Sequence, residues 1–105
     1  MTIKDSFSAL RALAPTVSVG ILTADLCRLG EAVGILETAG VHLVHFDIMD
    51  GQFCPQMTFG PPVVRAVKTR LLKDVHLMVT NPRPHLASFI AAGADIVTVH
   101  VESDT

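Results

Sequence analysis

Apolar residues along the chain alternate between short runs typical of strands and longer stretches with helical spacing. The run from Val41 to Ile48 is rich in β-branched and apolar residues, and Gly40 and Gly51 bound it, which predicts a buried strand. Comparable runs predict three further strands, within residues 16–22, 74–80 and 95–101. Four strands of ordinary length are therefore expected.

Apolar residues three or four apart predict a helix after each of the first three strands, within residues 26–40, 61–73 and 82–93. Asp25 and Asn81 are suitable N-caps, and Gly40 and Gly93 lie where C-terminal caps belong. The inward-facing residues are expected to be Leu29, Val33 and Leu36, then Val63, Val64, Val67 and Leu71, then Leu86, Phe89 and Ile90. Residues 1–15 form an expected helical extension that Pro15 stops.

The element order β-α-β-α-β-α-β with short connections predicts parallel strands joined by right-handed crossovers. A weak internal repeat agrees with this: AGVHLVHFDIMD at 39–50 matches AGADIVTVHVES at 92–103, and each strand turns polar at its carboxyl end. Polar side chains therefore gather at one edge of the sheet. In parallel α/β folds, open or closed into a barrel, this edge holds ligands and catalytic groups.

Composition narrows the class of protein. The 105 residues suit one domain, half of them are apolar, and the net charge is −2 with eight scattered Lys and Arg residues, so no nucleic-acid partner is expected. The sequence lacks the pattern of a signal peptide and a membrane-length apolar run, which predicts a cytoplasmic protein without a membrane partner. Cys27 and Cys54 have no CxxC spacing and are expected to be free thiols.

The strand at 41–48 carries the first candidate chemistry. His45, Asp47 and Met49 share one face, with neighbours about 6.6–7 Å apart along the strand. An ionised carboxylate in an apolar strand is costly unless it is paired, hydrogen-bonded or bound to a metal. Asp47 therefore either binds a metal beside His45 or caps the next turn through loop amides.

His76 extends this pair into a possible metal site. It lies in the next predicted strand, and neighbouring strands are about 4.8 Å apart, so the three side chains can meet. Two imidazoles and one carboxylate suit Zn, Fe(II), Mn or Co better than Mg or Ca. The alternative is that each histidine donates to a buried carbonyl. Met49 and Met78 share these faces, either as core residues or as an apolar floor under a small substrate.

The other histidines are weaker candidates. His100 and Glu102 end the fourth strand, where a satisfied polar pair is favoured over metal ligation. His42 and His85 are expected to be solvated. Residues 50–51 read first as a turn and second as a functional loop.

Several segments together resemble one family. VHFDIMDGQFCPQMTFGPPVV, DVHLMVTNP, AAGADIVTVHVES and ILTADLCRLG closely resemble the ribulose-phosphate 3-epimerases, and the resemblance spans about residues 17–103. It implies a parallel (β/α)₈ TIM barrel. Such a barrel takes about 250 residues, so this chain would form only the first half, four strands and three crossover helices.

The resemblance also implies an activity, metal-dependent C3 epimerisation of D-ribulose 5-phosphate to D-xylulose 5-phosphate through an enediolate. By motif match, His45, Asp47 and His76 would bind a divalent cation, and Asp47 would be one of two acid/base carboxylates. The residues expected to contact substrate are His76, Gly20, Met49 and Met78. A small sugar phosphate and further copies of the chain are the expected partners.

Three departures from the family pattern matter. Gly20, in SVGIL, replaces the usual serine, and residues 52–56 read QFCPQ where the family has His-Phe-Val-Pro-Asn. The second acid/base aspartate, which is also the fourth metal ligand, and the glycine-rich phosphate loops belong to the second half of the barrel. We therefore expect a fragment of a longer enzyme. The alternatives are a noncatalytic half-barrel or pseudoenzyme, and an epimerase for a hexulose phosphate such as allulose 6-phosphate.

Overall fold

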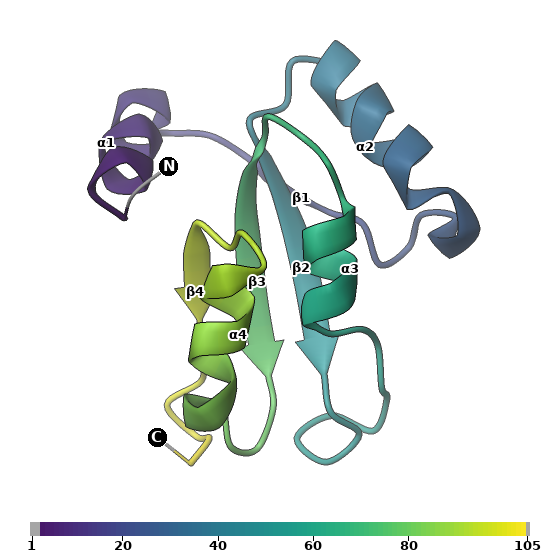
Figure 1. The fold of residues 1–105 in the computed structure, drawn as a ribbon, viewed down its shortest axis with the longest axis vertical. Helices are drawn as coiled ribbons and strands as arrows, with labels where there is room; N and C mark the ends of the chain where they lie inside the picture. The colour runs from purple at the N-terminus through teal and green to yellow at the C-terminus, as the bar shows by residue number, and fades with distance from the viewer. Residues whose placement is uncertain (1–2, 105) are drawn as a thin grey trace.

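The structure, a computed structural model, describes residues 3–104 and forms one parallel sheet with helices between its strands (Figure 1). The strands are β1 (Ser18–Gly20), β2 (Leu43–Met49), β3 (Leu72–Met78) and β4 (Ile96–Thr98), and they lie in the order β1-β2-β3-β4. A doubly wound sheet reverses its strand order at one point, whereas successive strands of a barrel stay neighbours. The predicted fold class, the first part of a parallel α/β barrel, is confirmed.

The described residues form four α-helices and two short 3₁₀ helices; the first α-helix precedes β1, and the others lie between successive strands. The α-helices are α1 (Ile3–Leu13), α2 (Leu29–Thr38), α3 (Pro61–Ala66) and α4 (Leu86–Ala91), and the 3₁₀ helices are η1 (Leu26–Arg28) and η2 (Arg83–His85). Figure 1 shows α3 and α4 in front of the sheet, while α1 stands apart from the other helices.

The two faces of the sheet differ in burial. From Val44 on β2 and from Lys73 on β3, burial alternates, so that every second side chain is buried and the intervening ones are half-buried. One core contains buried residues of both strands and of α2, α3 and α4: Val33, Val44, Phe46, Val64, Val75, Leu77 and Phe89. The helices therefore cover one face, and the half-buried side chains lie on the opposite, open face.

The outer strands are shorter than the sequence predicts. Residues 16–22 and 95–101 were expected to be strands, but β1 and β4 have three residues each. Within residues 3–104, each of these strands pairs with a neighbour on one side only. Val17 and Val99, just outside the paired segments, are 69% and 38% exposed. His100 and Glu102 consequently lie in a turn beyond β4.

The helices also depart from their predicted ends. The second predicted helix stops at Ala66, because Val67 is extended (φ −73°, ψ 108°) and its side chain enters the core. Lys73 belongs to β3, where it is buried and donates from Nζ to the Val64 carbonyl. Asp25 caps η1 rather than an α-helix by accepting from the Cys27 N–H.

The third predicted helix is divided into η2 and α4, just as the first is divided into η1 and α2. Pro82, not Asn81, is the N-cap of η2, and Ile90 of α4 is 50% exposed instead of inward-facing. The glycine predictions hold, since Gly40 and Gly93 have φ angles of 82° and 109° directly after their helices.

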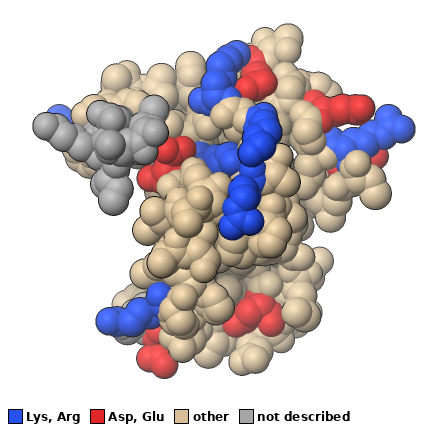
Figure 2. Space-filling view, in the orientation of Figure 1, with Lys and Arg blue, Asp and Glu red and all other residues tan. Residues whose placement is uncertain are grey.

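Charge on the helix-covered face is mixed. Figure 2 shows a short column of basic side chains over its upper half, with acidic side chains on either side of it, and a lower half that is mostly uncharged. Among the described residues, no helix is long and apolar enough to cross a membrane.

Candidate metal and catalytic site

The register between β2 and β3 brings the polar side chains of the open face together. The sequence His-x-Asp on β2 lies beside Asp-x-His on β3, so that His45 is opposite Asp74 and Asp47 is opposite His76. Each imidazole therefore has a carboxylate as its cross-strand neighbour. Alternation along both strands directs all four side chains to the same face.

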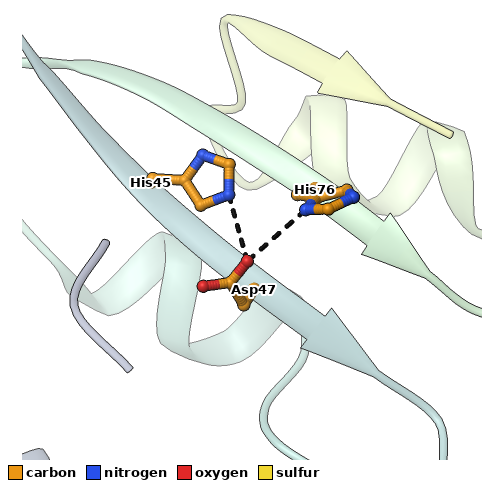
Figure 3. Close-up of side chains that lie close together, drawn as sticks. All are labelled: His45, Asp47 and His76. Carbon is orange, nitrogen blue, oxygen red and sulfur yellow. Dashed lines mark hydrogen bonds and ion pairs between the residues drawn. The ribbon is translucent and has the colours of Figure 1, made fainter. Parts of the chain in front are cut away.

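Asp47 lies at the centre of this cluster. Its Oδ1 is 3.0 Å from Nε2 of His45 and 3.4 Å from Nδ1 of His76. Figure 3 shows the carboxylate directed between the two rings. The three side chains are 24% to 25% exposed, so an ion can reach them from the open face.

These distances suit a shared cation. One nitrogen or oxygen from each of the three side chains lies within 4.8 Å of the other two. The two distances from Oδ1 of Asp47, 3.0 Å and 3.4 Å, match the spacing of about 3.0–3.4 Å between adjacent ligand atoms that lie about 2.1 Å from a tetrahedral or octahedral ion. The donor set, two nitrogens and one oxygen, fits a divalent transition metal. The geometry thus favours the metal-site hypothesis for Asp47 over the turn-cap alternative.

Two carboxylates surround His45. Burial lowers the pKa of His45, but the hydrogen bond and charge of Asp74, followed by those of Asp47, outweigh burial and raise the pKa above its ordinary value. Asp74 lies 2.8 Å from Nδ1 on the side of the ring away from Asp47.

His100 lies behind His76. Nε2 of His100 is 2.6 Å from Nε2 of His76, and the rings stack with centroids 4.8 Å apart. Phe53 covers the far side, 5.1 Å from the His100 centroid. The predicted pairing of His100 with Glu102 is not what the structure shows, because Glu102 is exposed in the turn. The His76–His100 contact depends on that turn, which the strand pattern did not reveal.

Asp50 organises the loop beside the cluster. Its Oδ1 accepts from the N–H groups of Gln52 and Phe53, both at 2.9 Å, and its Oδ2 accepts from the Thr80 N–H at 2.8 Å. These bonds, that of Thr80 first, lower the pKa of Asp50 to about 2. Gly51 follows with a φ of 78°, so the predicted turn is confirmed. The bond between Asp50 and Thr80 joins this turn to the loop after β3.

The candidate substrate contacts also lie on the open face. Gly20 is opposite His45 in the register, and a Cβ at Gly20 would lie 3.6 Å from Oδ2 of Asp47. Met49 and Met78 are opposite each other at the carboxyl ends of their strands and are half-buried.

Sequence reasoning missed Asp74 and Ser18. Oγ of Ser18 donates to Oδ2 of Asp74 at 2.8 Å. The mirrored spacing of His-x-Asp and Asp-x-His was the available signal for Asp74. His42 and His85 are exposed as expected, and both cysteines are free.

A parallel α/β sheet with a His-Asp-His cluster at the carboxyl end of its central strands defines the class of protein: an α/β fold with a site suited to metal-assisted chemistry. The profile described as "Ribulose-phosphate 3 epimerase family" matches residues 16–105, and the chain belongs to this family. The predicted family is therefore confirmed.

Curated relatives support the same assignment. The chain is 46% identical over 88 residues to a ribulose-phosphate 3-epimerase of Synechocystis, covering 82% of the chain and 38% of the relative. It is 48% identical over 91 residues to the chloroplastic ribulose-5-phosphate-3-epimerase of Arabidopsis thaliana, covering 85% and 32%, and 44% identical over 89 residues to the Bacillus subtilis ribulose-phosphate 3-epimerase, covering 83% and 41%. The chain thus spans well under half the length of these relatives.

Proposed function

We propose that this chain carries one half of the active site of a metal-dependent epimerase that interconverts D-ribulose 5-phosphate and D-xylulose 5-phosphate. The observation that carries the proposal is the register of β2 and β3, which joins His45, Asp47 and His76 at one point in a chain of this family. Those three residues would hold a divalent cation, Zn, Fe(II), Mn or Co.

Asp47 is the proposed base. Its Oδ1 contacts both histidines, whereas its Oδ2 is directed toward Gly20, where no side chain stands in the way. Oδ2 would therefore remove the C3 proton, leaving the electron pair in an enediolate over C2 and C3. When bound, the cation would stabilise the negative charge that develops on the enediolate oxygens.

Inversion at C3 requires a second acid on the opposite face of the substrate. The family resemblance assigns that acid to the second half of the barrel, together with the phosphate-binding loops. Gly20, His76, Met49 and Met78 are the proposed substrate contacts of this half. The homo-oligomeric state, the cytoplasmic location and the division into one domain with an extension at 1–15 stay predictions.

A metal titration of the 105-residue chain tests the site without turnover. We expect wild-type chain to bind Co²⁺ with an absorption spectrum typical of nitrogen and oxygen ligands, and Asp47→Asn to weaken binding at least tenfold. Glu102→Gln is the matched control, because it removes one negative charge from the same end of the sheet outside the ligand set. Equal affinity of wild type and Asp47→Asn would refute the assignment.

Turnover separates the remaining candidates. We expect a full-length protein containing this chain to convert ribulose 5-phosphate in the presence of metal, and Asp47→Asn to lower kcat by about 10²- to 10⁴-fold. Metal binding without turnover in any form of the protein would support the noncatalytic half-barrel. A higher kcat/KM on allulose 6-phosphate would reassign the substrate to a hexulose phosphate. Gly20 and Gln52, which both depart from the family pattern, motivate this comparison.

A further inference from the structure

Asp74 is a mostly buried carboxylate that is not among the proposed metal ligands. Its side chain is 14% exposed, and its Oδ2 lies 2.8 Å from both Nδ1 of His45 and Oγ of Ser18. A carboxylate in such a position is costly unless its partners compensate for lost hydration. The partners that compensate therefore indicate what Asp74 does.

These contacts form a chain across three strands. Ser18 on β1 donates to Asp74 on β3, and Asp74 faces Nδ1 of His45 on β2 between them. On the other side of the ring, Nε2 of His45 faces Asp47. Each ring nitrogen of His45 thus has its own carboxylate, and the two carboxylates lie on opposite sides of the ring.

A neutral imidazole has one N–H and one nitrogen lone pair. When Nδ1–H donates to Asp74, the lone pair belongs to Nε2, which is the atom beside Asp47. The opposite tautomer would direct an N–H toward the cation site and prevent ligation. Asp74, 2.8 Å from Nδ1, therefore favours the tautomer that can bind a metal, whereas Asp47, 3.0 Å from Nε2, competes for the ring proton in the metal-free chain.

We propose that Asp74, itself oriented by Ser18, is a positioning residue that holds the His45 ring with Nδ1 protonated and Nε2 free to bind a divalent cation. The cation is the one of the proposed function, so the proposal rests on that function. Outer partners of metal-binding histidines commonly change metal affinity by about 10- to 100-fold. Asp74 does not touch the cation in this scheme.

Co²⁺ titration of the 105-residue chain provides the first test. We expect Asp74→Ala to raise the Kd by about 10- to 100-fold, because it removes the acceptor of the Nδ1 proton. Asp74→Asn keeps an acceptor oxygen of nearly the same shape, and its Kd is expected to lie between those of wild type and Asp74→Ala. Ser18→Ala is expected to have a smaller effect than Asp74→Ala, and Glu102→Gln none.

Nitrogen-15 NMR of the His45 ring provides a second test that needs no metal. At a pH where the ring is neutral, wild-type chain should have a larger fraction of the Nδ1–H tautomer than Asp74→Ala, in which Asp47 is the carboxylate that remains beside the ring and draws the proton to Nε2. If Asp74→Ala misfolds by circular dichroism, Asp74→Asn and Ser18→Ala decide the question, through partial loss of the Nδ1–H tautomer and of affinity.

The two proposals fail in different ways. Wild-type chain that binds no Co²⁺ contradicts the metal site, and the NMR spectrum alone then decides whether Asp74 holds the ring. If folded Asp74→Ala binds Co²⁺ as tightly as wild type and has the same His45 tautomer, the positioning role of Asp74 is overturned, and the metal site stays in place.

Discussion

Gly20→Ala is expected to stabilise the chain, although the residue lies beside the proposed base. The added Cβ would be 3.6 Å from Oδ2 of Asp47, an ordinary contact distance, and Gly20 is not among the glycines with a positive φ. A glycine replaced without strain stabilises a protein by about 0.4–1 kcal/mol, mainly because the unfolded chain loses conformational freedom. For a domain of this size that corresponds to a rise in Tm of about 2–8 °C.

Gly40→Ala is the matched control, since the same methyl group is added in a different backbone conformation. Gly40 has a φ of 82°, and a Cβ there would meet nothing within 4 Å, so only the backbone resists the change. We expect a loss of roughly 1–2 kcal/mol, the cost of a left-handed conformation for an L-residue.

Thermal and urea unfolding of the two variants beside wild type, without added metal, measures both effects. Opposite signs are expected for the same chemical change. A lower Tm for Gly20→Ala would refute the reasoning, because it would mean that Gly20 is strained or that Asp47 approaches it more closely than described.

Two further predictions concern pH. Asp50→Ala removes an acceptor of three backbone N–H groups, so it should lower the urea midpoint and speed proteolysis within residues 51–57. The pKa of Asp50 falls from 3.8 to about 2 on folding. The difference in stability between Asp50→Ala and wild type should therefore persist above pH 3.8 and vanish as the pH falls toward 2. The raised pKa of His45 predicts the opposite pH dependence. In metal-free chain, the stabilisation that His45 provides is complete below its ordinary pKa of 6.5 and is lost as the pH rises through the raised pKa. Unfolding free energies of wild type and His45→Gln between pH 5 and 9 should therefore converge at high pH, and a constant difference would contradict this assignment.

The central part of the fold was predictable because local pattern and tertiary structure agree there. β2 (Leu43–Met49) falls almost within its predicted range, since alternation and flanking glycines both marked it. The ends of β1 and β4 were not predictable, because a neighbour's pairing sets where an outer strand stops. Val67 shows the same limit, since it continues the helical spacing of apolar residues but lies extended in the core.

The candidate site also has a part that was predictable from the sequence and a part that was not. His45, Asp47 and His76 could be identified from two segments considered separately, because each segment carries its own unusual polar residues. The role of Asp74 depends on the register of β2 and β3, since a shift of two residues would place it opposite a side chain other than His45. His100 could not be paired with His76 from the sequence because a turn, not a strand, brings it there.

The unequal strand lengths have a consequence for how the molecule opens. β2 and β3 are paired along seven positions, whereas β1 and β4 are each paired along three. Local opening begins where pairing is weakest, so amide protons of the outer strands should exchange first and those of the central pair last. His45, Asp47 and His76 all lie in this central pair. A cation would therefore meet ligands already ordered by folding, even while the strand that carries Ser18 is transiently detached.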